Sequence, residues 1–323
     1  MKAVICNTYG GPEVLTVQDI EMPKINSHQL LIRVTSSSVT TAESMMRQGT
    51  PKFARLFLGL KKPKAPITGT GFAGIVEATG EKVLNFSVGN QVFGETTLGF
   101  GTNADYVKIS EDGLVLIKPQ SINFTEAATL CDGALTAMNF LSEQVKLSKG
   151  QKVLINGASG SIGSAAIQIA KLMDLHVTGV CSSYNTELVK SLGADEVINY
   201  NHSDFTKSSE KYDVIFDTIG KSSFGKCKSI LSDKGTYLSP VLSLSLLAQS
   251  LISSCAGTKR ARFCATGLRP VKALKPLLQK IVKWYESGLF KSVIEKTYPM
   301  DKISDAHRHV DTSRKKGNIV LIH

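Results

Sequence analysis

The residues with the clearest chemical meaning follow an apolar run at 153–155. Ala158, Gly160 and Gly163 have the spacing A-x-G-x-x-G. Glycine at position 160 lets the backbone approach a pyrophosphate, and glycine at position 163 lets a following helix pack closely on the preceding strand. The first turn of that helix offers backbone N–H groups and a partial positive charge to phosphate oxygens. We therefore predict a phosphate-binding turn made of Ala158, Ser159, Gly160, Ser161, Ile162 and Gly163.

The surroundings of this turn favour a dinucleotide site over a flexible loop, because a strand pattern precedes it and a helical pattern and a second strand follow. An NAD site usually places Asp or Glu at the end of that second strand, to hold the ribose 2′-hydroxyl. Here Cys181, Ser182 and Ser183 stand there, and no acid occurs before Glu187. Small hydroxyl side chains leave room for a 2′-phosphate. We therefore predict NADP(H) over NAD(H), with a cation such as Lys190 neutralising the phosphate.

The rhythm of apolar residues changes at about 120. The first part is β-rich, with strand patterns at 30–34, 74–78, 89–94 and 104–109 and an exposed loop with a short helix at 51–66. After 120, helical patterns alternate with strand patterns at 152–156, 177–181, 196–200, 212–217, 236–238 and 262–265. This alternation is typical of an α/β fold with a doubly wound parallel sheet. A helix at 271–287 and strands at 293–294 and 318–322 are predicted to follow.

Composition and charge narrow the class of protein. The 323 residues are 42% apolar and 20% charged, which is enough for a sizeable core and unlike a disordered chain. The net charge of +11 indicates a solvated cationic surface or a field that favours a phosphorylated cofactor. Nucleic-acid binding is the least favoured interpretation, because the basic clusters contain few aromatic residues.

The remaining composition indicates a cytoplasmic protein. Six scattered cysteines without a C-x-x-C pair are typical of reduced cytosolic thiols. The first residues lack the pattern of a signal peptide. The most apolar segment, 241–256, is too short and too polar to span a membrane, so we predict a buried helix there.

Further motifs run along the whole chain in a consistent order. They are 10–15 (GGPEVL), 66–76 (PITGTGFAGIV), 86–94 (FSVGNQVFG), 127–137 (AATLCDGALTA), 192–195 (LGAD) and 316–320 (KGNIV). Together they resemble the medium-chain dehydrogenase/reductase superfamily and, within it, the zinc-free quinone oxidoreductase branch that includes zeta-crystallin. Two positions depart from the pattern: Gly71 stands where family members usually carry an acid, and Asn90 replaces an Asp.

The resemblance implies a GroES-like β-barrel domain at 1–119, a Rossmann domain at 120–266 and a return to the first domain at 267–323. Zinc-dependent members hold the catalytic metal with a Cys, the His of a Gly-His-Glu motif and a further Cys or Asp. Here Thr40 and Thr70 stand at the first two of these positions, whereas zinc prefers nitrogen and sulfur ligands. We therefore expect no zinc, and we interpret His307 and His309 as a surface pair.

The resemblance also supplies candidate catalytic residues. Thr40 takes a position that faces the nicotinamide, Glu43 takes that of the family's Asp in S-V-N-x-x-D, and Thr136 resembles a residue near the nicotinamide or its ribose. Each has a structural alternative. Thr40 would cap a strand end, Thr136 would be an ordinary helix hydroxyl, and Glu43 would form a salt bridge with Arg47 four residues later, which we favour.

Three further positions resemble cofactor contacts. Tyr200 would lie against the adenosine side or simply cover the sheet, Val241 would offer its backbone to the nicotinamide carboxamide, and Asn318 would contact the cofactor near the domain junction. Cys131 and Cys181 are interpreted as small buried fillers.

These features favour an NADPH-dependent reductase of quinones or α,β-unsaturated carbonyls. The alternatives are a zinc-independent NADP-linked alcohol or aldehyde dehydrogenase, and a cofactor-binding relative that acts through RNA or protein contacts. We expect a small-molecule substrate, no membrane partner and a homodimer, which in this family forms through the edge strand of the Rossmann sheet, here near 262–265.

Overall fold

The computed structural model describes residues 1–97 and 100–323. The chain forms two compact units. The first contains Met1–Asp132, Gly267–Ser287 and Ser292–His323, and the second contains Gly133–Thr266 and Gly288–Lys291. Each unit is described below by itself.

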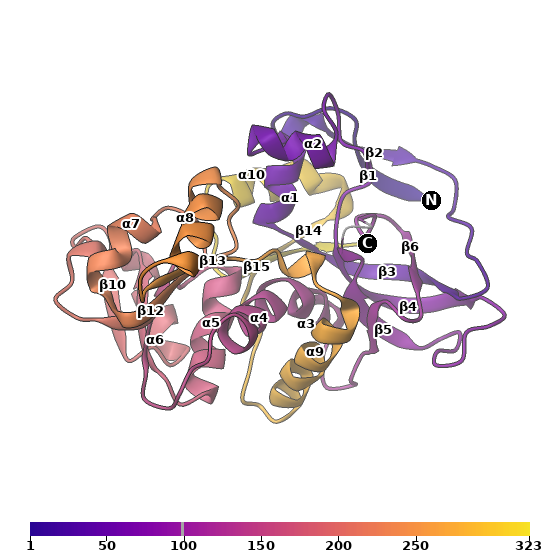
Figure 1. The fold of residues 1–323 in the computed structure, drawn as a ribbon. Helices are drawn as coiled ribbons and strands as arrows, with labels where there is room; N and C mark the ends of the chain where they lie inside the picture. Colours follow the sequence, from indigo (N-terminus) through magenta and orange to yellow (C-terminus); the bar gives the residue numbers. More distant parts are fainter. Residues whose placement is uncertain (98–99) are drawn as a thin grey trace. The chain divides into compact units, whose positions relative to one another are not determined.

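The second unit is built on a six-stranded sheet in the order β10-β9-β8-β11-β12-β13, with every neighbouring pair parallel. Its strands are β8 (Lys152–Asn156), β9 (His176–Cys181), β10 (Glu196–Asn199), β11 (Tyr212–Asp217), β12 (Leu231–Ser239) and β13 (Arg260–Phe263). Its helices are α4 (Leu135–Glu143), α5 (Ser161–Leu172), α6 (Thr186–Ser191), α7 (Phe224–Cys227) and α8 (Leu244–Cys255). The predicted doubly wound parallel sheet is confirmed, with α5 and α6 on one face and α7 and α8 on the other (Figure 1).

The middle strands of this sheet are short apolar runs because both of their faces are covered. Leu154 in β8 and Ile215 in β11 are fully buried and belong to one core cluster with residues of α7 and β12. The sheet order reverses between β8 and β11, which is where parallel sheets of this kind bind ligands at the carboxyl ends of the strands. The turns after β8, β9 and β11 are therefore the part of this unit where a ligand site is expected.

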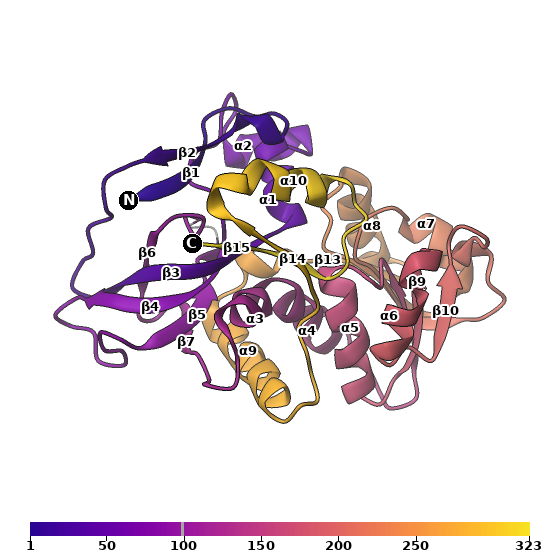
Figure 2. The same cartoon turned by 180° about the vertical axis from the view of Figure 1, so that it is seen from behind.

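The first unit is a mainly antiparallel barrel-like sheet in the order β14-β15-β3-β4-β5-β7, with β6 also paired to β3 and a separate β1-β2 ribbon (Figures 1 and 2). Its strands are β1 (Lys2–Cys6), β2 (Leu15–Asp19), β3 (Gln29–Val39), β4 (Gly71–Thr79), β5 (Gln91–Glu95), β6 (Tyr106–Ser110), β7 (Leu114–Ile117), β14 (Ile294–Pro299) and β15 (Asn318–Ile322). Its helices are α1 (Thr41–Gln48), α2 (Arg55–Leu58), α3 (Phe124–Thr129), α9 (Val271–Glu286) and α10 (Ile303–Asp311). The strand β15, from the end of the chain, pairs with β3.

The two compact units divide between Asp132 and Gly133, later in the chain than the domain boundary at 119 that the resemblance implies. The reason is α3, which packs on β3 and β4 of the first unit although it follows the β-rich region that ends with β7. A helical pattern after a β-rich region shows that the elements change, but it does not show on which sheet the next helix packs.

Two expectations about burial are wrong. The segment 241–256 does form a helix, α8, but Leu244, Leu251 and Ile252 on it are 64–70% exposed, so it is not a buried helix. His307 is fully buried on α10, so it is not part of a surface pair. Within the described residues, no helix combines the length and the apolar character that a membrane span requires.

Candidate active site

The predicted phosphate-binding turn joins β8 to α5. Gly157 has a φ of 79°, a conformation that favours glycine, and it turns the chain sharply after the strand. The backbone N–H groups of Gly157 and Ala158 donate to the carbonyl oxygen of Val180 in β9, at 3.2 and 3.0 Å. Gly160 is the N-cap of α5 and, being glycine, has no side chain to cap the helix. The first N–H groups of a helix have no partner within the helix, and they are suited to bind a phosphate.

Glycine stands at positions 160 and 163, at the start of α5, for two different reasons. A Cβ atom at Gly163 would lie against the carbonyl oxygen of Gly157 and 2.8 Å from Cα of Ala158, so the fold itself requires glycine there. A Cβ atom at Gly160 would meet only the oxygen of Gly157, at an ordinary 3.5 Å. The fold therefore leaves space at Gly160 that a pyrophosphate approaching the backbone would use. The turn fits a dinucleotide.

The structure gathers the predicted adenosine-side residues around the ends of β9 and β10. The N–H of Tyr200 donates to the carbonyl oxygen of Cys181 at 3.1 Å, and the side chain of Asn199 donates to the hydroxyl of Ser183 at 2.8 Å. Cys181 is buried, as predicted for a filler, and Tyr200 is exposed. Lys190 lies 4.0 Å from the carboxylate of Glu187, so part of its charge is already compensated.

Sequence reasoning missed Asn185, which follows the second strand. Its Nδ2 donates to the hydroxyl of Ser159 in the phosphate-binding turn at 2.9 Å. Its Oδ1 is buried and has no hydrogen-bond partner among the described residues. Because a buried acceptor without a partner is costly, this atom supports a ligand hydroxyl at the same place. In the sequence, Asn185 stands in a polar stretch, and nothing in that stretch indicates a contact with the turn or with a ligand.

Asp217 was also missed. It ends β11 and is fully buried, and it accepts hydrogen bonds from Tyr237 Oη at 2.7 Å and Asn156 Nδ2 at 2.9 Å. The backbone N–H groups of Gly220 and Ser222 also donate to it, at 3.0 and 2.8 Å. The carboxylate thus holds the loop after β11 beside the end of β8. Burial and the neighbouring charge of Asp217 raise the pKa of Tyr237, which therefore stays a hydrogen-bond donor.

Thr136 and Val241 lie in the same unit as the turn. Thr136 is half-buried in the first turn of α4. A Cβ atom at Gly133 would lie 2.7 Å from the carbonyl oxygen of Ser161, so the starts of α4 and α5 are in close contact. Val241 packs against Gly220 in the loop after β11, and its N–H donates to the hydroxyl of Ser239 at 3.2 Å.

Thr40 and Glu43 belong to the first unit, where they form a capping box at the start of α1. The hydroxyl oxygen of Thr40 accepts from the N–H of Glu43 at 3.0 Å, and Glu43 Oε2 accepts from the N–H of Thr40 at 2.8 Å. Thr40 therefore has a structural role, as a helix cap rather than a strand cap. Ile319 pairs with Val39, so Asn318 lies next to the position of Thr40 along the sheet.

A buried polar network extends from Glu43 into the barrel. Asn103 Nδ2 donates to Glu43 Oε1 and to Thr68 Oγ1, both at 2.9 Å, and its Oδ1 accepts from Ser37 at 2.7 Å. Ser37 in turn lies 2.9 Å from Nε2 of His323. Burial raises the pKa of Glu43 to about 8, against the lowering effect of these donors. Burial therefore favours the protonated form of this carboxyl group.

The favoured salt bridge between Glu43 and Arg47 is wrong. The guanidinium of Arg47 is buried and pairs with Asp311 of α10 at 2.6 Å, and it donates to the carbonyl oxygen of Gly10 at 2.8 Å. Glu43 is directed instead to Thr40 and Asn103 by the capping box and the network. The i,i+4 spacing is compatible with a pair, but α10 brings an acid from far along the chain.

The donor set near α1 does not fit a zinc ion. Thr40 already uses its hydroxyl oxygen as a cap, and Thr70 offers a second hydroxyl where zinc prefers nitrogen or sulfur. A Cβ atom at Gly71 would lie 2.7 Å from the hydroxyl of Ser38 and 3.0 Å from the carbonyl oxygen of Ala128, which leaves no space for an acid. Among the described residues, no three His, Cys, Asp or Glu side chains are grouped for a metal ion.

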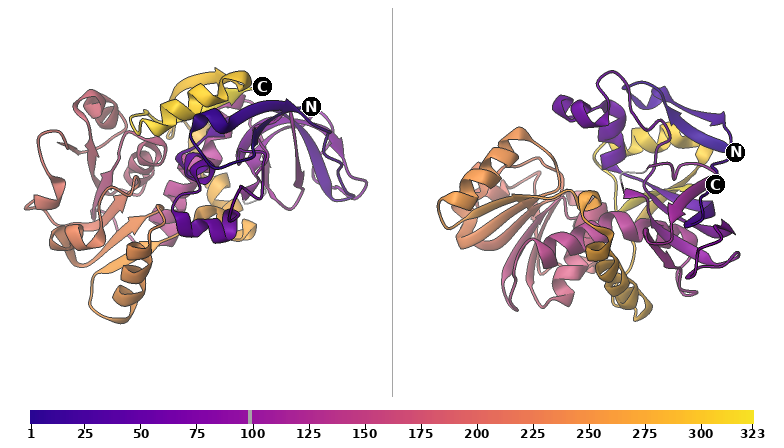
Figure 3. Two further views of the ribbon diagram at one scale, coloured as in Figure 1. Left: turned by 90° about the horizontal axis from the view of Figure 1, so that it is seen from above. Right: turned by 45° about the vertical axis from the view of Figure 1, so that its right-hand side comes forward.

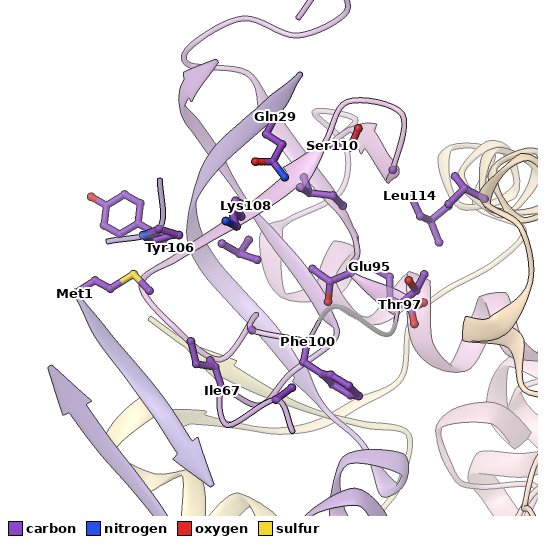
Figure 4. Close-up of a pocket in the computed structure, with 18 of the residues that line it drawn as sticks. Met1, Gln29, Ile67, Glu95, Thr97, Phe100, Tyr106, Lys108, Ser110 and Leu114 are labelled. Atoms are coloured by element: carbon purple, nitrogen blue, oxygen red, sulfur yellow. The ribbon is translucent and has the colours of Figure 1, made fainter. Parts of the chain in front are cut away.

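Two cavities among the described residues of the first unit differ greatly in size. The larger, of about 460 Å³, contains none of the residues predicted for the site; Figure 4 shows Ile67 and Phe100 towards one end of it and Gln29 and Ser110 towards the other. The smaller, of about 40 Å³, is lined by Glu43 with Thr68 and residues of the 51–66 segment. It has room for water, but not for a substrate. Each cavity is lined by a carboxyl group whose pKa burial raises to about 8, Glu95 in the larger and Glu43 in the smaller. We assign more weight to the smaller one, because Glu43 is a residue that the sequence predicts for the site.

Comparisons with known proteins agree with these features. Residues 26–119 match the model of the alcohol dehydrogenase GroES-like domain, and residues 192–321 match that of the zinc-binding dehydrogenases. The chain is 31% identical to the mitochondrial NAD(P)H oxidoreductase RTN4IP1 of Bos taurus, over 99% of this chain and 89% of the relative. It is 28% identical to the chloroplastic NADPH-dependent alkenal/one oxidoreductase of Arabidopsis thaliana, over 99% and 79%. Among solved structures, the quinone oxidoreductase of Coxiella burnetii matches with a TM-score of 0.90 and 26% identity, over 100% and 99% of the two chains.

Proposed function

This chain belongs to the medium-chain dehydrogenase/reductase superfamily, together with quinone and enone oxidoreductases, and from that membership we propose that it is an NADPH-dependent reductase of quinones or α,β-unsaturated carbonyls that works without zinc. The observation that carries the proposal is the turn at Gly157–Gly163. It leads into helix α5 and lies next to the end of β9, where no acid stands. The relatives are oxidoreductases named for NAD(P)H or NADPH, which supports a nicotinamide cofactor.

The preference for NADPH rests on the end of β9. Ser182 and Ser183 offer hydroxyl groups where NAD-dependent enzymes place an acid, and an acid there would repel a 2′-phosphate. Asn185 ties this strand end to the turn through Ser159, so the two parts of the proposed cofactor site are held together. Tyr200 lies at the same edge, next to the end of β9.

We propose that Thr40 and Glu43 are the catalytic residues of the first unit. When bound, the dinucleotide supplies a hydride. The accompanying proton would come from Glu43, whose pKa of about 8 keeps the carboxyl protonated at neutral pH beside a water-sized cavity. Thr40 accepts a hydrogen bond as a cap and keeps its hydroxyl hydrogen to donate to the substrate's oxygen, where it would stabilise developing negative charge. We propose a mechanism without zinc because Thr40 and Thr70 offer hydroxyl groups where zinc-dependent members of the family have a Cys and a His.

Titration with both reduced coenzymes tests the proposal. We expect NADPH to bind at least tenfold more tightly than NADH, and we expect NADPH to be consumed with quinones or enones in a substrate panel. Tighter binding of NADH would refute the cofactor preference. Consumption of NADPH only with simple aldehydes would favour the alcohol or aldehyde dehydrogenase alternative. Binding without turnover, together with salt-sensitive RNA binding, would favour a non-enzymatic relative. A cytoplasmic location remains a prediction.

A homodimer is the proposed assembly. The strand β13 lies at the edge of the six-stranded sheet, and α8 beside it exposes Leu244, Leu251 and Ile252. An unpaired strand edge next to an apolar helix face is suited to pairing with a second copy. We expect sedimentation equilibrium to give twice the mass of the chain. A single-chain mass that does not change with concentration would reject the dimer.

A further inference from the structure

The segment 51–66 of the first unit combines a concentrated positive charge with exposed apolar side chains. It contains Lys52, Arg55, Lys61, Lys62 and Lys64 and no Asp or Glu. Its charge of +5 is close to half of the net charge of +11, although it is only a small part of the chain. Such a concentration of one sign creates a local field that attracts an anionic surface.

Three large apolar side chains of this segment face outward. Leu56 is 66% exposed, Phe57 77% and Leu60 69%. Single exposed apolar residues are ordinary on protein surfaces, but three within five positions form a patch. Figures 1 and 2 show α2, which carries Leu56 and Phe57, at the outer end of the first unit. No other described element of that unit covers these side chains.

The backbone beneath this patch is firmly held. The hydroxyl of Tyr9 donates to the carbonyl oxygen of Gly59 at 2.6 Å, and the guanidinium of Arg55 lies 4.4 Å from the centre of the Tyr9 ring. Arg55 also donates to the carbonyl oxygens of Gly49 and Gln48, at 3.0 and 3.1 Å. Gly59 has a φ of 122°, and a Cβ atom there would meet the carbonyl oxygen of Lys62. The apolar residues are therefore presented by a fixed turn, at no cost in ordering the segment on binding.

Contrary to the expectation of no membrane partner, we propose that the segment 51–66 docks the protein on an anionic lipid bilayer. Leu56, Phe57 and Leu60 would enter the interface between head groups and acyl chains, and Lys52, Lys61 and Lys62 would contact anionic head groups around them. Aromatic and leucine side chains flanked by lysines are the composition of peripheral membrane contacts, in which apolar burial and charge attraction add together. The proposal does not depend on the proposed reaction, because docking is measured without turnover.

Flotation with lipid vesicles tests the docking surface. The full chain is mixed with vesicles of phosphatidylcholine alone or of phosphatidylcholine with phosphatidylserine, at low and high salt. We expect binding to the anionic vesicles that weakens with salt, and little binding to the neutral ones. Absence of binding to the anionic vesicles at low salt would overturn the proposal.

Two variants and a matched control locate the contact. Changing Lys52, Lys61 and Lys62 to Gln should lower the apparent affinity at least tenfold, because the attraction to anionic head groups is lost. Changing Leu56, Phe57 and Leu60 to Ser should also lower it at least tenfold, because the buried apolar area is lost. The control changes three exposed lysines of α9 to Gln and removes the same charge from the opposite end of the unit (Figure 3, right); they are Lys272, Lys280 and Lys283. An equal loss in the control would indicate a general charge effect and overturn the assignment.

The apolar variant separates insertion from surface attraction. If it binds anionic vesicles as well as the parent chain, the segment does not enter the bilayer and the proposal is wrong. If it instead changes the mass in sedimentation, the patch contacts a second copy, which also overturns the proposal. Fluorescence of Phe57→Trp gives an independent readout. Its emission should shift to shorter wavelength with anionic vesicles, while the parent, with Trp284 as its only tryptophan, should show no shift.

Discussion

Gly160→Ala is expected to weaken NADPH binding at least tenfold, equivalent to about 1.4 kcal/mol, while the free energy of unfolding stays close to that of the parent chain. The fold has space for a methyl group at this position, since the nearest atom, the carbonyl oxygen of Gly157, would lie 3.5 Å away. The methyl group would occupy the space through which a pyrophosphate approaches the backbone. Calorimetric titration and urea unfolding measure the two effects separately.

Gly163→Ala should give the opposite pattern. Its methyl group would press on the backbone of Gly157 and Ala158, which cannot move without disturbing β8. Overpacking of this kind costs about 3 kcal/mol, so the urea midpoint should fall clearly.

Gly225→Ala is the matched control for both variants, because a Cβ atom there meets nothing within 4 Å. If Gly160→Ala binds NADPH as tightly as this control does, then no phosphate lies against the turn. If Gly163→Ala unfolds like the control, the close packing described here is wrong.

Glu43→Gln is expected to change how stability depends on pH. The pKa of Glu43 is about 8 in the folded protein, above its ordinary value of 4.5. Between these two values the folded state holds a proton that the unfolded state has lost. The free energy of unfolding therefore falls as pH rises through this window, by about 5 kcal/mol at most. Below pH 4.5 both states are protonated, and this loss disappears.

Glutamine keeps the shape of the protonated side chain without its titration. The variant should therefore lose less stability than the parent between about pH 6.5 and 8. Below pH 6.5 a second group acts in the other direction. Burial lowers the pKa of His307 from 6.5 to about 3, so the unfolded state binds the extra proton and stability falls on acidification. The Glu43 effect is therefore measured on the alkaline side.

Urea unfolding at a series of pH values is the measurement. Glu77→Gln serves as the matched control, because it removes one carboxylate from an exposed position of β4. Parallel pH dependences of the Glu43 and Glu77 variants would contradict a buried, protonated Glu43. A rate of NADPH oxidation that falls in Glu43→Gln, but not in Glu77→Gln, would in addition support its role as proton source.

The sequence predicted best those elements whose signal is local. The limits of β8, β11 and β15 agree with the predicted strands, because each is a short apolar run buried in its sheet. The strand, turn and helix of the predicted phosphate-binding segment were located for the same reason, since they are contiguous in the sequence. The hydroxyl-rich end of β9 could also be located in the sequence, because the length of α5 fixes where β9 follows.

Contacts between distant parts of the chain could not be predicted. Asp217 accepts a hydrogen bond from Asn156 across neighbouring strands, and Asn103 donates one to Glu43, which lies 60 residues earlier in the chain. Arg47 shows why local spacing misled. Glu43 and Arg47 have the i,i+4 spacing that favours an ion pair, but the carboxylate of Glu43 takes part in the helix cap. Arg47 pairs instead with Asp311, which lies on a helix near the end of the chain.

The exposure of α8 illustrates another limit. The apolar content of 241–256 was correctly read as helical, but composition does not show which face of a helix finds a partner. Leu246 and Ser253 are the two buried residues of that helix, and its other apolar side chains remain exposed. Hydropathy therefore predicted the element but not its environment.

The position of β15 has a consequence for how the protein is made. This strand lies between β14 and β3, so the first unit takes a central strand from residues 318–322. The second unit, by contrast, uses an almost continuous stretch that ends at Thr266, apart from Gly288–Lys291. On the ribosome the second unit can thus fold while the first unit, although translated first, still lacks its last strand. Its β3 edge therefore stays unpaired until synthesis is nearly finished.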